Sequence, residues 1–301
     1  MPWLKRTIQN AIALGMRVPG LRQTAGGAAR WGVIPQAVWR RIPVTGIVHV
    51  TIDSTTEIVY HSGLMDHLGR ALFFGDAIAW EPEILRVLPT LARLAPGVLD
   101  VGAHTGLFTL IALAANPKAR AVAVEPVMAN AQLLQANLDA NHMATRCILC
   151  VAAVADQPGV VAFDRGPVEI PMTSSIRTAE PDADGYRVPA VNLDTIARWL
   201  PTVDLIKVDV EGFEHLVLAG GRELFAASRP TLIVECLPGS RIGEFDSFLD
   251  QLGYQRFHLL PSHAEPIDRV HPTADGPSHN YLLAARPEIL AVLRKDFAKA
   301  G

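Results

Sequence analysis

A glycine turn at the end of an apolar segment is the first place where this sequence can do chemistry. Residues 98–106 read Val-Leu-Asp-Val-Gly-Ala-His-Thr-Gly, and nineteen residues after Gly106 a second apolar run ends in Glu125. Glycine lets a chain bend sharply and lets a ligand approach the backbone. A carboxylate at the tip of the following strand can accept hydrogen bonds from ribose hydroxyls. The sequence therefore predicts a nucleoside site made by Asp100, Gly102, Ala103, His104, Gly106, Glu125 and Pro126.

The residues of this turn also indicate which nucleoside it binds. A dinucleotide fingerprint is G-x-G-x-x-G, whereas Asp100-x-Gly102-x-x-x-Gly106 lacks the middle glycine that lets a pyrophosphate approach. Asp100 would repel a phosphate and attract a cation. S-adenosylmethionine has a ribose, an adenine and two positive groups but no phosphate, so it fits better than a nicotinamide dinucleotide. A nicotinamide-dependent oxidoreductase of the same fold is the alternative.

An acid after the third apolar run extends this prediction. Asp156 closes the run 147–154 and would flank the second strand, where it could accept the adenine amino group. Its reading as an ordinary turn residue before Pro158-Gly159 stays open.

A second charged segment, residues 204–215, places acids, a lysine and a histidine around the end of another apolar strand. Such charges are costly beside an apolar strand unless they bind something. Asp209 and Glu211 alternate with valines, so we expect them to project to one side and to be the first catalytic candidates. His215 is the third, with a helix-surface role as its alternative.

Glu235 ends the next strand and should lie beside Asp209. Two carboxylates there could bind Mg²⁺ or deprotonate a substrate hydroxyl. Lys207, within the same apolar strand as Asp209, is expected to pair with Asp209 or Glu211.

The elements that position these residues alternate between strands and helices. Repeated β-α-β units predict an α/β fold with a doubly wound, mostly parallel Rossmann-like sheet, and ligands then bind outside the carboxyl ends of its strands. We expect strands at 98–101, 121–124, 147–154, 204–208 and 231–235, and helices at 107–115, 129–141, 215–227 and 242–252. Residues 46–60 predict a β-hairpin, which Phe73-Phe74 could extend. We therefore divide the chain into an N-terminal extension, residues 1–80, which could form a lid or an acceptor-binding surface, and a catalytic domain, residues 81–301.

Composition limits the class of protein. The chain has 301 residues, a hydrophobic fraction of 50 % and a net charge of −3, which argues against nucleic-acid binding. No apolar run reaches the roughly 18 residues of a membrane span, and no signal peptide is evident. Three cysteines favour a reducing compartment, so we expect a cytoplasmic protein. Cys147 and Cys150 lie in an apolar strand, which favours a structural pair over a zinc site.

The N-terminal segment is basic. Seven lysines and arginines precede the first acid, Asp53, and apolar residues between them predict an amphipathic helix. This helix would contact a membrane surface or an acidic partner, or else pack on its own domain.

These motifs together resemble the FkbM family of S-adenosylmethionine-dependent methyltransferases. The resemblance covers about residues 80–285, and its most specific element is Lys207-x-Asp209-x-Glu211-Gly212-x-Glu214. The turn at 100–106 and Val124-Glu125-Pro126 also match, although His104 stands where asparagine is usual. The resemblance implies a cofactor site at Asp100, Gly102, Gly106 and Glu125, with Asp209 and Glu211 in the active site.

The same resemblance implies O-methylation of a hydroxyl on a sugar, glycan or other natural product. We expect a small-molecule or glycan acceptor, a homo-oligomer, and no transmembrane segment. A non-catalytic nucleoside-binding protein of this fold is a further alternative.

Overall fold

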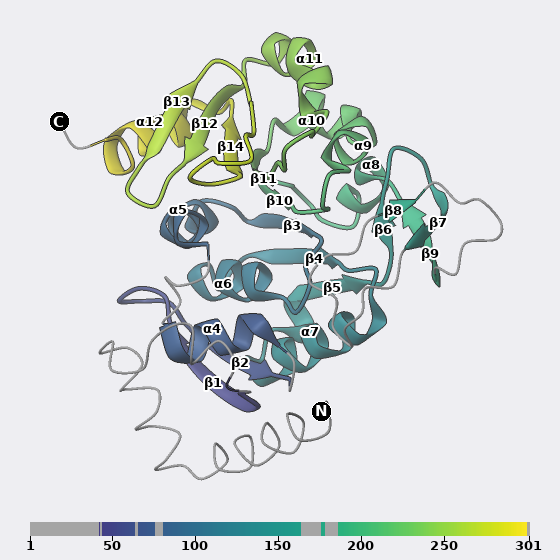
Figure 1. Ribbon diagram of the computed structural model, residues 1–301, viewed down its shortest axis with the longest axis vertical. Helices are drawn as coiled ribbons and strands as arrows, with labels where there is room; N and C mark the ends of the chain where they lie inside the picture. The colour runs from purple at the N-terminus through teal and green to yellow at the C-terminus, as the bar shows by residue number, and fades with distance from the viewer. Residues whose placement is uncertain are drawn as a thin grey trace.

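A mixed eight-stranded sheet is the centre of the molecule (Figure 1). The structure, a computed structural model, describes residues 42, 44–63, 66–75, 81–163, 176–177 and 186–299. The strand order is β13-β12-β14-β11-β10-β3-β4-β5, in which β11, β10, β3, β4 and β5 are parallel neighbours. The basic N-terminal segment and its predicted membrane contact lie outside the described residues.

The five parallel strands are almost entirely apolar, as a sheet covered on both faces requires. They are β3 (Gly97–Val101), β4 (Arg120–Val124), β5 (Cys147–Cys150), β10 (Leu205–Val208) and β11 (Thr231–Glu235). The antiparallel edge consists of β14 (Asn280–Ala284), β12 (Gln255–Leu259) and β13 (Ala264–Ile267). The expected doubly wound sheet is confirmed, and it carries an antiparallel margin.

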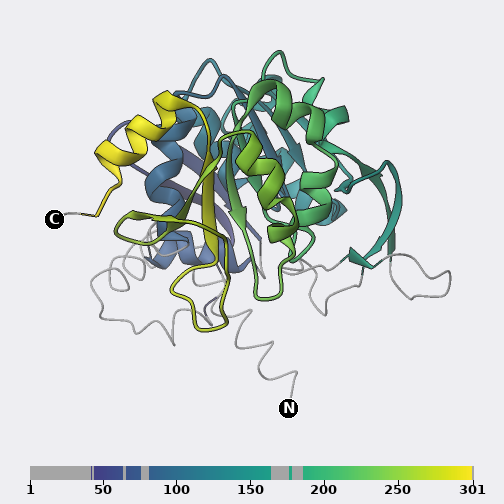
Figure 2. The same cartoon turned by 90° about the horizontal axis from the view of Figure 1, so that it is seen from above.

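Helices cover both faces of the sheet (Figure 2). Each face has its own apolar core. The first layer contains α4 (His67–Gly75), α5 (Pro82–Arg93), α6 (Leu107–Ala115), α7 (Met128–Ala140) and α12 (Pro287–Asp296). The second contains α8 (Leu193–Ala197), α9 (Glu214–Ala219), α10 (Arg222–Ser228) and α11 (Asp246–Gln251), with the short helices η2 (Ala144–Arg146) and η3 (Ile242–Phe245) in connections. No described helix is both long enough and apolar enough to cross a membrane.

Several predicted elements are shorter than expected. The helix predicted over 215–227 divides into α9 and α10 at Gly220-Gly221. A Cβ on Gly220 would lie 2.4 Å from the carbonyl oxygen of Ala155, so the two helices approach the neighbouring chain closely there. The strand predicted over 147–154 also divides, because β6 (Ala153–Val154) leaves the main sheet to pair with β9 (Tyr186–Val191).

That small sheet has the order β6-β9-β7-β8 and includes β7 (Gly159–Phe163) and β8 (Ile176–Arg177). The prediction that Phe73-Phe74 extend the hairpin is wrong, since both lie in α4.

The predicted hairpin exists as β1 (Gly46–Thr51) and β2 (Glu57–Ser62). Its outer β2 edge lies on the end of α7, where the side chains of Asn137 in the helix and of Asn141 directly after it replace a strand partner. Asn141 hydrogen-bonds both the N–H (2.8 Å) and the C=O (2.6 Å) of Val59, and Asn137 accepts the N–H of His61 at 2.6 Å. The hairpin residues Val48, Val50 and Tyr60 share an apolar core with α6 and α7. The division at residue 80 stays a prediction.

Candidate functional site

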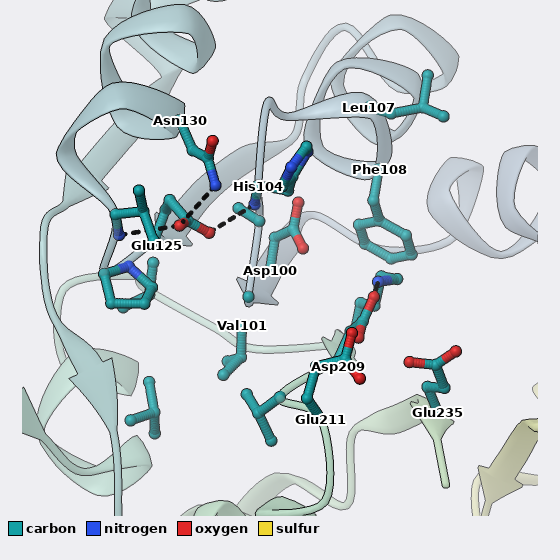
Figure 3. A pocket seen from close by; sticks show the side chains of 18 of the residues that line it. Asp100, Val101, His104, Leu107, Phe108, Glu125, Asn130, Asp209, Glu211 and Glu235 are labelled. Atoms are coloured by element: carbon teal, nitrogen blue, oxygen red, sulfur yellow. Dashed lines mark hydrogen bonds and ion pairs between the residues drawn. The ribbon is translucent and has the colours of Figure 1, made fainter. Parts of the chain in front are cut away.

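One cavity lies at the carboxyl ends of the parallel strands, where doubly wound sheets bind ligands. Its walls include the carboxyl ends of β3, β4, β10 and β11, the loops after them, and residues of α5 and α6. Figure 3 shows ten of the lining residues by label, among them Asp100, Glu125 and Asp209. The charged groups in these walls are Glu81, Asp100, Glu125, Lys207, Asp209, Glu211 and Glu235. Among the described residues, six carboxyl groups therefore surround one lysine ammonium.

Asp100 is fully buried at the end of β3. Its Oδ2 accepts hydrogen bonds from the N–H and hydroxyl of Thr109 on α6, while its Oδ1 has no hydrogen-bond partner among the described residues. Burial raises the pKa of this carboxyl. A buried oxygen without a partner is expensive unless a ligand supplies the donor, so Asp100 fits a cationic N–H group.

The glycine turn is packed against the acidic strand ends. Gly102 has φ of +81°, and a Cβ there would lie 1.8 Å from the carbonyl oxygen of Asp209. Gly106 has φ of +92°, and a Cβ there would lie 2.8 Å from the side chain of Leu134 on α7. Glycine is required at Gly102 both for its backbone angle and for the close approach of the Asp209 backbone.

Glu125 is 4 % exposed and holds the next loop in place. Its carboxylate accepts N–H groups from His104 (2.8 Å), Val127 (2.9 Å) and the amide of Asn130 (3.2 Å) (Figure 3). Burial raises the pKa of Glu125 to about 7 despite these donors. A carboxylate has about four acceptor positions, so one remains for a ligand hydroxyl. The Oδ1 of Asn130, which is buried without a described partner, offers a second acceptor.

Lys207 and Asp209 form a largely buried ion pair, with Nζ 2.6 Å from Oδ2. Burial alone would raise the pKa of Asp209, but the Lys207 ammonium holds it below its usual value. Carboxylate oxygens of Asp209, Glu211 and Glu235 lie within 4.8 Å of one another. The three groups can therefore share protons, and their spacing also suits a divalent cation, although Lys207 already contacts Asp209.

Glu211 and Glu235, the other two acids of this cluster, retain their protons more strongly than Asp209. Burial and the neighbouring Asp209 raise the pKa of Glu211 to about 7 and that of Glu235 to about 9. Glu235 is therefore protonated at neutral pH, while Glu211 is close to half ionised. A group that titrates near the working pH is the most effective general base.

Backbone conformation marks the same region. Among the described residues, positive φ occurs at five non-glycine positions, and Glu81 (45°), His104 (50°) and Glu211 (55°) all line the cavity. Side chains rarely adopt this conformation, and exceptions concentrate at functional sites.

Comparison with known proteins identifies the family. The Methyltransferase FkbM domain profile matches residues 100–256, more than half of the chain. The chain belongs to the FkbM methyltransferase domain family. The matched region begins at Asp100 and contains every cavity acid except Glu81.

Solved structures of methyltransferases are similar to this FkbM chain in fold. Methyltransferase FkbM from Methylobacillus flagellatus is 17 % identical with a TM-score of 0.42, and the match covers 72 % of this chain and 55 % of that one. The O-methyltransferase from Bacillus cereus in complex with SAH is 13 % identical with a TM-score of 0.39, covering 67 % and 80 %. A putative O-methyltransferase from Klebsiella pneumoniae is 15 % identical with a TM-score of 0.39, covering 70 % and 82 %.

This chain thus spans little more than half the length of the M. flagellatus protein. No curated protein sequence matches it.

The structure of this FkbM domain brings most predicted site residues together. Asp100, Gly102, Ala103, His104, Glu125, Pro126, Asp209, Glu211 and Glu235 all line the cavity, and Gly106 supports its turn from behind.

Two predicted residues lie elsewhere. His215 is outside the cavity, where its ring stacks on Phe213 and its Nε2 lies 3.4 Å from Arg241. Asp156 does not line the cavity either. It is close enough to His215 for its carboxylate to influence the pKa of the imidazole. The argument that Asp209 and Glu211 alternate along a strand is wrong, because β10 ends at Val208. They converge through the following turn instead, where Glu211 and Gly212 both have positive φ.

Sequence reasoning missed Glu81 and Asn130. Glu81 lies directly before α5, and the start of that helix was visible in Glu81-Pro82. Asn130 is in the first turn of α7, five residues after Glu125, and that spacing on the helix following Glu125 was the available signal.

Proposed function

We propose that this chain is an S-adenosylmethionine-dependent O-methyltransferase acting on a hydroxyl of a sugar, glycan or other natural product. The observation that carries the proposal is the buried Asp100 Oδ1, which lacks a partner beside a glycine turn and a ribose-compatible Glu125. Family membership supports methyl transfer as the reaction.

The residues of the cavity fit this cofactor. Asp100 would accept the ammonium group, and Glu125 with Asn130 would accept the ribose hydroxyls. Pro126, Val127 and the apolar residues 152–154 would enclose the adenine. The excess of carboxyl groups over Lys207 favours a positively charged ligand over a phosphate. When bound, S-adenosylmethionine supplies a methyl group on a positively charged sulfur.

The acidic cluster would manage the proton of the acceptor. An alcohol is a weak nucleophile at neutral pH, so a nearby base must take its proton as the new bond forms. We assign this role to Glu211, whose pKa of about 7 matches it. Asp209, held by its ion pair with Lys207, would orient the acceptor hydroxyl. Protonated Glu235 would donate a hydrogen bond to Asp209.

A divalent cation on Asp209, Glu211 and Glu235 is the competing arrangement, favoured by their convergence within 4.8 Å. It would require Asp209 to exchange the Lys207 contact for the metal. Turnover that requires Mg²⁺ and disappears in EDTA would support the cation. Turnover that persists in EDTA would support proton transfer to Glu211.

The first experiment is calorimetric titration with S-adenosylmethionine, its demethylated product and NAD⁺. Wild type, Asp100→Asn and Glu125→Ala are compared with the surface variant Glu244→Gln. We expect both sulfur nucleosides to bind wild type and Glu244→Gln, and to bind the other two variants at least tenfold more weakly. Binding of NAD⁺ in preference to the sulfur nucleosides would favour the oxidoreductase alternative and refute this proposal.

The second experiment follows formation of the demethylated product with a panel of hydroxyl-bearing sugars, glycans and phenols. Glu211→Gln should reduce the rate about 100-fold or more, as loss of a general base does, while leaving cofactor affinity nearly unchanged. Equal rates in wild type and Glu211→Gln on an accepted substrate would show that Glu211 is not the base.

A further inference from the structure

The hairpin is connected to the cavity turn by a continuous series of hydrogen bonds. Tyr60 on β2 is fully buried, and its hydroxyl lies 2.9 Å from Oδ2 of Asp66 and also contacts the hydroxyl of Thr105. The Thr105 hydroxyl in turn lies 3.1 Å from Nδ1 of His104. We call these four residues the Asp66–His104 chain.

The direction of each hydrogen bond follows from counting protons. The Asp66 carboxylate can only accept, so Tyr60 must donate its single hydroxyl proton to it. The bond between Tyr60 and Thr105 then needs the Thr105 proton, since Tyr60 has none left. Thr105 has now donated its own proton, so its oxygen can only accept from His104. The proton of the neutral imidazole must therefore be on Nδ1.

We propose that the hairpin fixes the tautomer of His104 through this chain, with Tyr60 and Asp66 as positioning residues for the cavity. Nε2 then carries the lone pair and can only accept hydrogen bonds. The His104 ring would select N–H or O–H donors of a bound ligand over acceptors such as carbonyls. The ligand part of this inference rests on the proposed function, whereas the tautomer assignment does not.

The position of His104 explains why its tautomer matters. His104 lines the cavity, its backbone N–H donates to Glu125, and its ring is close enough to Asp209 to influence that group's charge. The same turn is fixed a second time from the hairpin side, because Asn137 links the C=O of Thr105 to the N–H of His61. The β1–β2 hairpin and Asp66 therefore reach the ligand site through the back of the turn.

The test is the ¹⁵N NMR spectrum of the histidine side chains in the ligand-free full chain, at a pH where His104 is neutral. The variant His104→Asn assigns the signal by its disappearance. We expect the Nδ1–H form in wild type. Tyr60→Phe removes the acceptor of Thr105, and Asp66→Ala lets Tyr60 donate to Thr105. Thr105 can then donate to His104 in both variants, so both should shift the signal toward the Nε2–H form.

One control separates this role from simple support of the fold. Asn141→Ala removes the hydrogen bonds of Val59 and loosens the same hairpin without touching the Asp66–His104 chain, so it should retain the Nδ1–H form. An Nε2–H signal in wild type, or equal shifts in Asn141→Ala and Tyr60→Phe, would overturn the proposal. If Tyr60→Phe does not fold, the wild-type and Asp66→Ala spectra still decide it.

Titration with the demethylated cofactor adds the functional readout. We expect Tyr60→Phe to weaken its binding about two- to tenfold, the worth of one hydrogen bond, and Asn141→Ala to leave it within twofold. Equal affinities of wild type and Tyr60→Phe would show that the tautomer does not act on the ligand. If wild type does not bind this probe at all, the proposed function fails, while the ligand-free spectra still decide the tautomer.

Discussion

Replacing Gly102 by alanine tests how tightly the glycine turn at residues 102–106 is joined to the acidic cluster. Gly102 combines φ of +81° with a carbonyl oxygen 1.8 Å from the position that a Cβ would take. Gly253 offers a matched control, because its φ is +78° but nothing lies within 4 Å of its Cβ position. The two alanine variants share the unfavourable backbone angle and differ in the clash.

The magnitudes follow from these two contributions. A left-handed conformation costs an alanine about 1–2 kcal/mol, and the reduced entropy of the unfolded chain returns about 0.4–1 kcal/mol. Gly253→Ala should therefore lower the free energy of unfolding by roughly 1 kcal/mol. At Gly102 the obstructing atom belongs to the backbone of Asp209, so the end of β10 must also move. Overpacking of this kind adds about 1–3 kcal/mol or more.

Urea unfolding of wild type and both variants measures this difference, with Gly159→Ala as a position without positive φ or close neighbours. We expect the order of stability to be Gly159→Ala, then Gly253→Ala, then Gly102→Ala. Cofactor affinity should fall in Gly102→Ala alone, because Asp209 and the turn move together. Equal destabilisation by Gly102→Ala and Gly253→Ala would refute the claim that the close approach to Asp209 constrains the turn.

Three further outcomes are expected. The ligand-free protein should lose stability as pH rises from about 5 to 9. Burial raises the pKa values of Glu125, Glu211 and Glu235, so over this range the folded state binds more protons than the unfolded state. Urea unfolding at several pH values measures the free energy of unfolding, and a value that does not change with pH would contradict this expectation. Lys207→Met should lower the free energy of unfolding by about 3–5 kcal/mol, because Asp209 loses its buried ion-pair partner. In a double-mutant cycle, adding Asp209→Asn should recover part of that loss. Asn137→Ala should lower the free energy of unfolding by about 2–4 kcal/mol, because it removes the hydrogen bonds of Asn137 to the N–H of His61 and to the C=O of Thr105. A loss no larger than that of a surface substitution in the same unfolding assay would argue against a supporting role for Asn137.

The sequence was most informative where one local pattern determines one local structure. The apolar runs of β3, β4, β10 and β11 predicted their strands, and parallel pairing then placed Asp100, Glu125, Asp209 and Glu235 at one edge of the sheet. That deduction needs only the rule that consecutive β-α-β strands point the same way.

The remaining features depend on contacts between distant segments. Glu81 is in the cavity because α5 begins beside β10 and β11, and no spacing in the chain encodes that contact. Asp209 and Glu211 were expected to alternate along a strand, but β10 ends at Val208 and the backbone then turns through Glu211 and Gly212. His215 follows this turn in α9 and lies outside the cavity. The hydrogen bonds from Tyr60 to Thr105 join residues 45 positions apart and have no local signature.

The asparagine pair on α7 also has a consequence for how the protein behaves among its own copies. The outward-facing N–H and C=O of a strand at the margin of a sheet are a template on which another chain can add a strand. Asn141 occupies both groups of Val59, and Asn137 occupies the N–H of His61. This margin of the hairpin is therefore closed to strand addition by the protein's own helix, which protects a two-stranded sheet from edge-to-edge aggregation.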